Sequence, residues 1–159
     1  MQVKKITFLS REEVKELERI LEKNYGAKIS LKDFGVAKDK EEKIWLTSKE
    51  VLSFDFSKLK VNSLGFNFGK LKRNEKIHLT IEGSQIVGKS ATKNIAILSE
   101  ENVLKFMQGL DVKPEKEINC EYHNFAIVKF KDKILGSSLL TEQGIKNMIP
   151  KSRRIPFIL

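Results

Sequence analysis

The hydrophobic positions near the start of the chain recur every three or four residues. Between residues 14 and 21 the apolar side chains fall on one face of a helix, and the opposite face carries mixed charges. The run Ser10–Glu13 matches a capping box, in which each side chain binds the backbone amide of the other residue. Gly26 supplies the left-handed conformation that commonly ends a helix. The pattern predicts a helix between Ser10 and Gly26.

Shorter apolar runs follow this helix, and they alternate or are rich in β-branched and aromatic residues. The strand candidates are Ala27–Leu31, Gly35–Ala37, Lys43–Thr47 and Val61–Leu71. A second capping box, Thr47–Glu50, predicts a short helix through Val51 and Leu52. One long helix with several short strands predicts that residues 1–75 form a small N-terminal α+β module.

The second half of the chain has a different pattern, with many short strands and glycine corners. Ile77–Ile81 and Asn94–Leu98 are predicted strands, and Glu82–Gly88 is predicted to be a compact turn between glycines. Phe125–Phe130 and Ile134–Leu140 flank a short charged segment, a spacing that predicts a tight hairpin. The pattern predicts a small closed or half-closed barrel.

A helix is also predicted within this half. Ser99 stands before two acidic residues, which favour the positive end of a helix, and Gly109 follows where the helix should stop. The helix is expected over Glu100–Gln108. Its apolar face is expected to comprise Val103, Leu104 and Met107. The predicted fold class is therefore α+β, with a small N-terminal α/β module followed by a β-pseudobarrel over residues 76–159.

The C-terminal segment is cationic. Beyond Glu142 the sequence contains no acidic residue, whereas it contains four basic ones. These are Lys146, Lys151, Arg153 and Arg154. A cationic segment without neighbouring acids favours the binding of an external anion. Because the segment follows the predicted hairpin, a sheet can hold it in place, and we expect the anion to be a nucleic acid.

The overall composition agrees with that expectation without requiring it. The chain has 30 basic and 21 acidic residues, a formal charge of +9 and a pI near 9.6. The same excess is typical of lysine-rich proteins from hot habitats. Cys120 is the only cysteine, which excludes an internal disulfide and a thiolate metal cluster. The apolar runs are too short for a signal peptide or a membrane span, so we expect a cytoplasmic location.

Several segments of the second half occur in an order typical of one RNA-binding domain. They are Phe106–Val112, Phe125–Phe130, Ile134–Ser137 and Ile145–Arg154. In this order the chain resembles a PUA domain, the small pseudobarrel that accompanies many RNA-modifying enzymes. The last segment is similar to the PUA-type tail of the Sun-type RNA cytosine-C5 methyltransferases. Stand-alone archaeal ribosome-biogenesis proteins related to that family share this plan, and the resemblance covers residues 76–154.

The resemblance implies an RNA-binding surface over the glycine-rich segment and the last strand. Gly83 and Gly88 would let backbone amides approach a phosphate, and nearby lysines would add charge. Alternatively, both glycines only turn a corner of the barrel. The residues that match the expected surface are Lys89, Lys93, Lys146, Asn147, Lys151, Arg153 and Arg154.

The sequence carries no pattern typical of catalysis or of cofactor binding. The glycines of Gly65–Gly69 lie within an alternating strand, not in the strand-to-helix loop that would hold S-adenosylmethionine. The Sun-type enzymes use a pair of catalytic cysteines, which a single cysteine cannot supply. Neither histidine has a further ligand at metal-binding spacing. We therefore expect no catalysis, no cofactor and no metal site.

A few other residues have a plain interpretation beside a functional one. Phe66 and Phe68 share a strand face, which suits base stacking or, more commonly, the core. Asp111 suits a catalytic base or, more commonly, a turn whose amides it binds. His123 precedes the hairpin and suits contact with ribose or phosphate as well as a plain surface position. His78, inside an alternating strand, is expected to be structural or on the surface.

The sequence therefore predicts a non-catalytic RNA-binding protein that acts on ribosomal or transfer RNA. Its expected role is in ribosome biogenesis, including rRNA processing, or in RNA modification. Its expected partners are structured RNA and either an RNA-modifying enzyme or a ribosome-assembly factor. One alternative is a small enzyme, or an accessory subunit of an RNA-modifying enzyme, with a nucleotide-sized pocket lined by Lys70, Arg73 and Lys76. The other is a protein-interaction subunit whose charge serves solubility.

Overall fold

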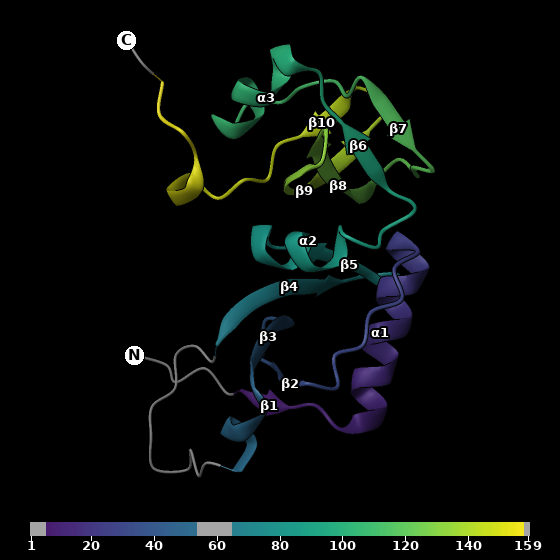
Figure 1. Cartoon of the computed structure of the whole chain (residues 1–159), viewed down its shortest axis with the longest axis vertical. Coiled ribbons are helices and arrows are strands. Elements are labelled where there is room, and N and C mark those ends of the chain that lie inside the picture. The colour runs from purple at the N-terminus through teal and green to yellow at the C-terminus, as the bar shows by residue number, and fades with distance from the viewer. Residues whose placement is uncertain (1–5, 54–64, 158–159) are drawn as a thin grey trace.

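The first sheet is antiparallel and follows the order of the chain. The computed structural model describes residues 6–53 and 65–157. Within these ranges the first sheet has the strand order β1-β2-β3-β4-β5. The strands are β1 (Thr7–Phe8), β2 (Phe34–Lys38), β3 (Lys43–Ser48), β4 (Phe66–Lys72) and β5 (Lys76–Leu79). Helix α1 (Arg11–Tyr25) lies along one side of this sheet (Figure 1).

The second sheet is mixed and has the order β10-β9-β8-β6-β7. Its strands are β6 (Ile95–Ile97), β7 (Lys116–Ile118), β8 (Asn124–Phe130), β9 (Lys133–Thr141) and β10 (Gly144–Lys146). β6 runs parallel to β8, and the other pairs are antiparallel. The predicted hairpin is confirmed as β8 and β9, with Phe130 opposite Lys133 at the turn. The α+β class is confirmed, whereas the PUA-like character of this sheet stays a prediction.

Helix α1 forms as its sequence predicts. The Ser10 amide donates to the Glu13 carboxylate at 3.0 Å, and the Glu13 amide donates to the Ser10 hydroxyl at 3.2 Å. Gly26 ends the helix with a φ of 64°. The face that packs on the first sheet buries Leu17, Ile20, Leu21 and Tyr25. The short helix predicted after the second capping box also forms, as the 3-10 turn η1 (Lys49–Ser53).

The compact turn predicted at Glu82–Gly88 is wrong, because this segment is helical. Helix α2 (Ile81–Val87) lies between the two sheets and contacts β4 and β9 (Figure 1). The Thr80 hydroxyl caps it by accepting from the Gly83 amide at 3.0 Å. A Cβ at Gly83 would lie 2.0 Å from the Phe68 carbonyl oxygen. The glycine therefore serves close packing of a helix on a strand.

Other differences between prediction and structure are local. Helix α3 (Glu100–Met107) begins at Ser99 as predicted, although the Ser99 hydroxyl makes no capping hydrogen bond. Its buried side chain is Phe106, whereas Leu104, expected in the core, is 55 % exposed. The strand predicted at Ala27–Leu31 is irregular, since the Leu31 amide donates to the Glu18 carboxylate at 2.8 Å and not to a neighbouring strand. Part of the predicted strand Val61–Leu71 lies outside the described residues.

The described residues form two hydrophobic cores, and both sheets contribute to the first of them. The first core, between α1 and the first sheet, also contains Val87 of α2 and Ile127 of β8. The second core packs α3 against the second sheet and contains Phe106. The expected boundary at residue 75 lies in the turn of the β4–β5 hairpin, where Lys72 faces Lys76. The strand predicted at Ile77–Ile81 thus belongs to the first sheet.

Glu75 ties α1 to the β4–β5 turn, and we expect its contribution to depend on pH. Its carboxylate pairs with Lys23 and Arg19, and these hydrogen bonds lower its pKa from 4.5 to about 2. A lowered carboxyl pKa gives stability that is present above pH 4.5 and lost as the pH falls toward 2. Glu75→Gln should therefore lower Tm at pH 7. The difference in Tm from the natural chain should shrink below pH 4.5 and disappear near pH 2 in thermal unfolding followed by circular dichroism. A pH-independent difference would contradict this account.

Candidate nucleic-acid interface

A groove of about 500 Å³ lies between the first sheet and the C-terminal segment. Its floor includes residues of β4, β5 and the start of α2, and its far wall is formed by residues 148–150, 152 and 153. The wall includes the 3-10 turn η2 (Lys151–Arg153), drawn in yellow in Figure 1. The groove therefore joins residues from β3 and β4 to residues more than seventy positions later in the chain.

The charges that line the groove are mainly positive. Lys43 of β3, Lys70 of β4 and Arg153 of η2 contribute three cations, and Glu82 contributes the one acidic side chain among the described lining residues. Arg153 donates to the Glu82 carboxylate at 2.6 Å. Burial raises the pKa of Glu82, whereas the hydrogen bond from Arg153 lowers it, and the net shift is downward. Glu82 is therefore ionised, and Arg153 neutralises its charge. Lys43 pairs with Glu41 at 3.2 Å, so the lining cation that remains without an acidic partner among the described residues is Lys70.

The floor of the groove carries no further charge at neutral pH. His78 of β5 lies 3.4 Å from the Ser137 carbonyl oxygen, and its ring packs on Phe125. Burial lowers the pKa of His78 below its ordinary value of 6.5, so the ring is neutral at pH 7. The Asn67 side-chain oxygen is buried and has no hydrogen-bond partner within the described part of the chain. The cations suit a phosphorylated ligand, and the Asn67 oxygen suits a hydrogen-bond donor on it, over a floor that also includes apolar side chains.

The C-terminal cations that the sequence singled out have different environments. Arg153 lines the groove, and exposed Lys151 lies between its lining residues Pro150 and Ser152. Arg154 turns away, since its Nε donates to the Ile149 carbonyl oxygen at 3.0 Å and its side chain packs over Gly109. Arg154 therefore holds the segment against the loop after α3.

Asn147 also has a structural role. Its side-chain amide donates to the Phe106 and Leu110 carbonyl oxygens at 2.8 and 2.9 Å, and its side-chain oxygen accepts from the Ile149 amide at 2.8 Å. Asp111 accepts from the Asn147 backbone amide at 2.8 Å. Asp111 is thus the satisfied turn residue that the sequence favoured, and Asn147 fastens the segment to the end of α3.

Lys89, Lys93 and Lys146 do not line the groove. The Lys93 amide donates to the Tyr25 carbonyl oxygen at the end of α1, and Lys89 is exposed two residues after the end of α2. Lys146 is exposed at the end of β10, opposite Leu139. The structure thus separates the cations that the sequence grouped.

The glycine-rich phosphate cradle predicted near Gly83 and Gly88 is wrong. The Gly83 amide donates to the Thr80 hydroxyl, and the Gly88 amide donates to the Ser84 carbonyl oxygen at 2.7 Å. Both amides are therefore occupied within α2 and its cap. The base-stacking interpretation is also wrong for Phe68, which is fully buried in the first core.

The other chemically reactive side chains are satisfied by local contacts. The Cys120 thiol donates to the Ile95 carbonyl oxygen at 3.2 Å, and burial raises its pKa. His123 contacts the Glu142 carboxylate at 2.9 Å on the surface. Lys76, expected in the nucleotide-sized pocket, donates to the His123 carbonyl oxygen at 2.8 Å and does not line the groove. Lys70 of that expected set does line it.

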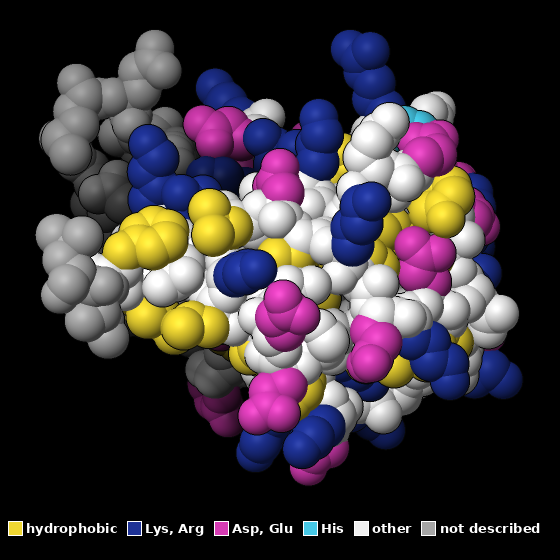
Figure 2. All heavy atoms as spheres, turned by 90° about the horizontal axis from the view of Figure 1, so that it is seen from above, with side chains coloured by type: hydrophobic (Ala, Val, Ile, Leu, Met, Phe, Trp, Pro, Cys, Tyr) yellow, Lys and Arg dark blue, Asp and Glu magenta, His cyan; other side chains and the backbone are white. Residues whose placement is uncertain are grey.

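The face of the molecule seen from the α3 end shows no broad basic patch. Viewed from the end that carries α3, Lys and Arg side chains are interspersed with Asp and Glu (Figure 2). A mixed surface of this kind favours solvation over binding of a long polyanion. The groove is therefore the better candidate for an anion site than the visible face of the second sheet.

Sequence reasoning had missed Lys43 as a groove residue. Its only signal was a basic residue at the start of a β-favouring run, which is common at strand ends.

Within the described residues, no three His, Cys, Asp or Glu side chains are grouped as a metal site would require, and no helix has the length and apolar character of a membrane span. No protein-family model matches the chain, and no curated protein matches it.

Proposed function

We propose that this chain is a non-catalytic RNA-binding protein whose groove holds phosphates of structured ribosomal or transfer RNA. The observation that carries the proposal is the meeting of Lys70, on the first sheet, with the C-terminal turn η2 across a groove whose one described acid is already neutralised. The PUA-like interpretation of the second half belongs to the same proposal. So does a role in ribosome biogenesis or RNA modification.

Arg153 can serve both its acidic neighbour and a phosphate. A guanidinium has five N–H donors in a planar fork, and the bond to Glu82 uses Nη1. Lys70 and Lys151 supply point charges, and neither has an ion-pair partner within residues 6–53 and 65–157. Such contacts recognise the backbone and shape of folded RNA more than its sequence. The proposal therefore includes affinity that falls steeply with salt.

The test removes the two unpaired lysines. We expect Lys70→Gln with Lys151→Gln to weaken binding to an RNA hairpin roughly 20- to 60-fold at about 0.1 M salt, since each phosphate contact contributes a factor of about 5 to 8 there. The slope of log K against log salt should become shallower by about 1.4 to 1.8. Fluorescence anisotropy across a salt series measures both quantities.

The matched control removes two exposed lysines elsewhere, Lys113 and Lys116, as glutamines. It has the same net charge as the test variant but leaves the groove unchanged, so it should keep most of the affinity. Equal losses in both variants would mean that only net charge matters. If K70Q/K151Q keeps its affinity and K89Q/K93Q loses more, RNA binds at the other end of α2 and the assignment of RNA to the groove is refuted.

The size of the groove favours one rival. A volume of about 500 Å³ lies within the range of small-ligand pockets, about 300 to 1,000 Å³. A small enzyme or accessory subunit with a nucleotide site would use the same Lys70 and Arg153. In that case a mononucleotide should bind at micromolar concentration and displace the RNA hairpin. A mononucleotide that fails to compete favours the RNA-binding protein.

A further inference from the structure

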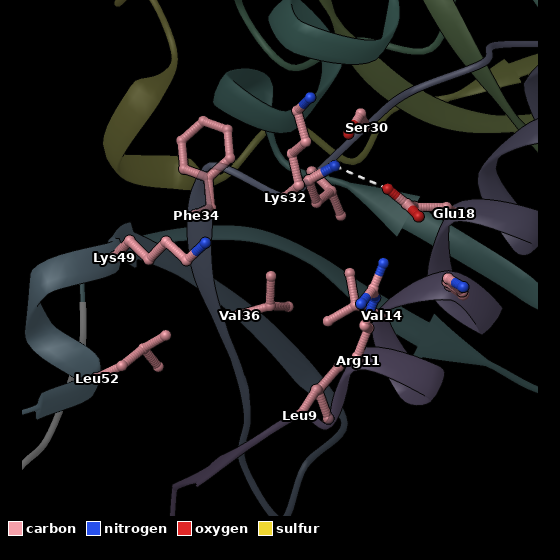
Figure 3. A pocket seen from close by; sticks show the side chains of 12 residues that line it. Leu9, Arg11, Val14, Glu18, Ser30, Lys32, Phe34, Val36, Lys49 and Leu52 are labelled. Carbon is pink, nitrogen blue, oxygen red and sulfur yellow. Dashed lines mark hydrogen bonds between the residues drawn. The ribbon is translucent and has the colours of Figure 1, made fainter.

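A second groove, of about 620 Å³, lies on the first half of the chain (Figure 3). It is bounded by the first turns of α1, by β2 and by η1. It shares no described lining residue with the groove that we assign to RNA. The two grooves are therefore separate sites.

The floor of the second groove is apolar. Figure 3 shows side chains from the segment before α1, from α1, from β2 and from η1 around one space. The apolar side chains include Leu9, Val14, Phe34, Val36 and Leu52. Leu52 is 44 % exposed, and Leu9, Val14 and Phe34 are only partly buried where they pack on the first core. The first core thus reaches solvent here, as at surfaces that bind other proteins.

The rim of the same groove is cationic. Arg11 and Lys15 lie on the face of α1 that lines it, and Lys32 and Lys49 approach from the opposite side. The one acidic side chain among the described lining residues is Glu18, which accepts from the Leu31 amide at 2.8 Å (Figure 3). Four cations therefore surround an apolar floor with one acid between them.

The basic residues of α1 differ in whether they have an ion-pair partner. Away from the groove, Arg19 pairs with Glu16 and Glu75, and Lys23 pairs with Glu75. Arg11 and Lys15 belong to the same helix but have no ion-pair partner among the described residues, and the same holds for Lys32 and Lys49. Within α1, the basic residues without an ion-pair partner in the described part of the chain are therefore the two that line the groove.

We propose that this second groove binds an acidic segment of a protein partner, which inserts apolar side chains between Val14, Val36 and Leu52. Its Asp and Glu side chains pair with the cationic rim, and its apolar side chains cover the exposed part of the floor. RNA fits this site less well, because an aliphatic floor offers bases no hydrogen bonds and only Phe34 offers a ring for stacking. The chain would thus join an RNA to an acidic protein.

The experiment uses the full chain and two labelled acidic peptides of about 15 residues. One has leucines at helical spacing and the other has leucines at alternate positions, with Glu or Asp elsewhere, because a groove can accept a helix or an extended segment. We expect at least one of them to bind in fluorescence anisotropy. Lys15→Gln with Lys49→Gln, and separately Leu52→Ser, should each weaken binding about tenfold. The control K113Q/K116Q should bind the peptide as the natural chain does.

Several results would overturn the proposal. If neither peptide binds, the groove does not accept an acidic segment. If a leucine-free acidic peptide binds equally well, the partner inserts no apolar side chains. Displacement of the peptide by an RNA hairpin would assign this groove to nucleic acid. A dimer in size-exclusion chromatography that Leu52→Ser dissociates would assign it to a second copy. Because Leu52 is half exposed and Lys15 and Lys49 are on the rim, circular dichroism should show that both variants fold.

Discussion

Asn94→Ala is expected to lower the free energy of unfolding by about 3 kcal/mol. Asn94 is 1 % exposed and has a φ of 54°, where alanine is strained. Its side chain donates to the Asn24 carbonyl oxygen at the end of α1 and accepts from the Glu121 amide at 3.0 Å. The alanine variant therefore leaves two polar groups without partners where α1 meets the second sheet. Urea unfolding followed by circular dichroism measures the loss.

Two companion variants separate the causes. Asn94→Gly loses the same hydrogen bonds but accepts the positive φ, so it should be about 1 kcal/mol more stable than Asn94→Ala. Asn119→Ala has the same kind of backbone, with a φ of 46°, but its side chain donates to the Thr92 carbonyl oxygen in an exposed position. It should lower the free energy of unfolding by about 1.5 kcal/mol, mostly from alanine at the positive φ, because the exposed hydrogen bond can be replaced by water. Similar losses at Asn94 and Asn119 would show that the buried junction contributes nothing special.

The second large effect is expected at Gly83, where α2 touches β4. Gly83→Ala places a Cβ 2.0 Å from the Phe68 carbonyl oxygen, which is backbone and cannot rotate away. Helix and strand must separate by more than an ångström, so we expect a loss of about 3 kcal/mol in unfolding free energy. Thr80 and Glu82, beside Gly83, line the groove assigned to RNA. RNA affinity in anisotropy should therefore fall although no charge is removed.

Gln85→Ala provides the control on the same helix. Gln85 is exposed and donates from its side chain to the Ile134 carbonyl oxygen at 2.6 Å. Loss of this hydrogen bond should lower the free energy of unfolding by about 1 kcal/mol and leave RNA affinity unchanged. A Gly83→Ala protein as stable as Gln85→Ala would mean that α2 and β4 do not pack as closely as described.

The elements that the sequence predicts best are those whose signals are local. The capping box at Ser10 and the stop at Gly26 bound α1, and the alternating runs around residues 131–133 define the β8–β9 hairpin. Helix α2 has only the weak local signal of Thr80 as its N-cap, and two glycines within eight residues are more typical of a turn. Its stability comes from packing between the sheets, above all from the contact of Gly83 with Phe68. Contacts of that kind are tertiary and leave no periodic pattern.

The candidate site was only partly predictable for a related reason. The cationic character of the segment after Glu142 follows directly from the sequence, and Arg153 and Lys151 do lie at the groove. The partner cations, Lys43 and Lys70, come from strands far away in the chain, so only the fold brings them together. Sequence alone also could not show that the side chains of Arg154 and Asn147 donate hydrogen bonds to backbone carbonyl oxygens.

The way in which the C-terminal segment is fastened has a consequence for the proposed RNA complex. Before η2, the Asn147 side chain donates to the Phe106 carbonyl oxygen at 2.8 Å. After it, Arg154 packs over Gly109 and the Ile155 amide donates to the Met107 carbonyl oxygen at 2.8 Å, so contacts to α3 and its loop hold η2 on both sides. A basic tail that orders only on binding loses conformational entropy at that moment, which weakens the complex. Here the ordering occurs when the chain folds. Lys151 and Arg153 are thus preorganised, and docking of RNA would resemble the meeting of two rigid surfaces more than coupled folding and binding.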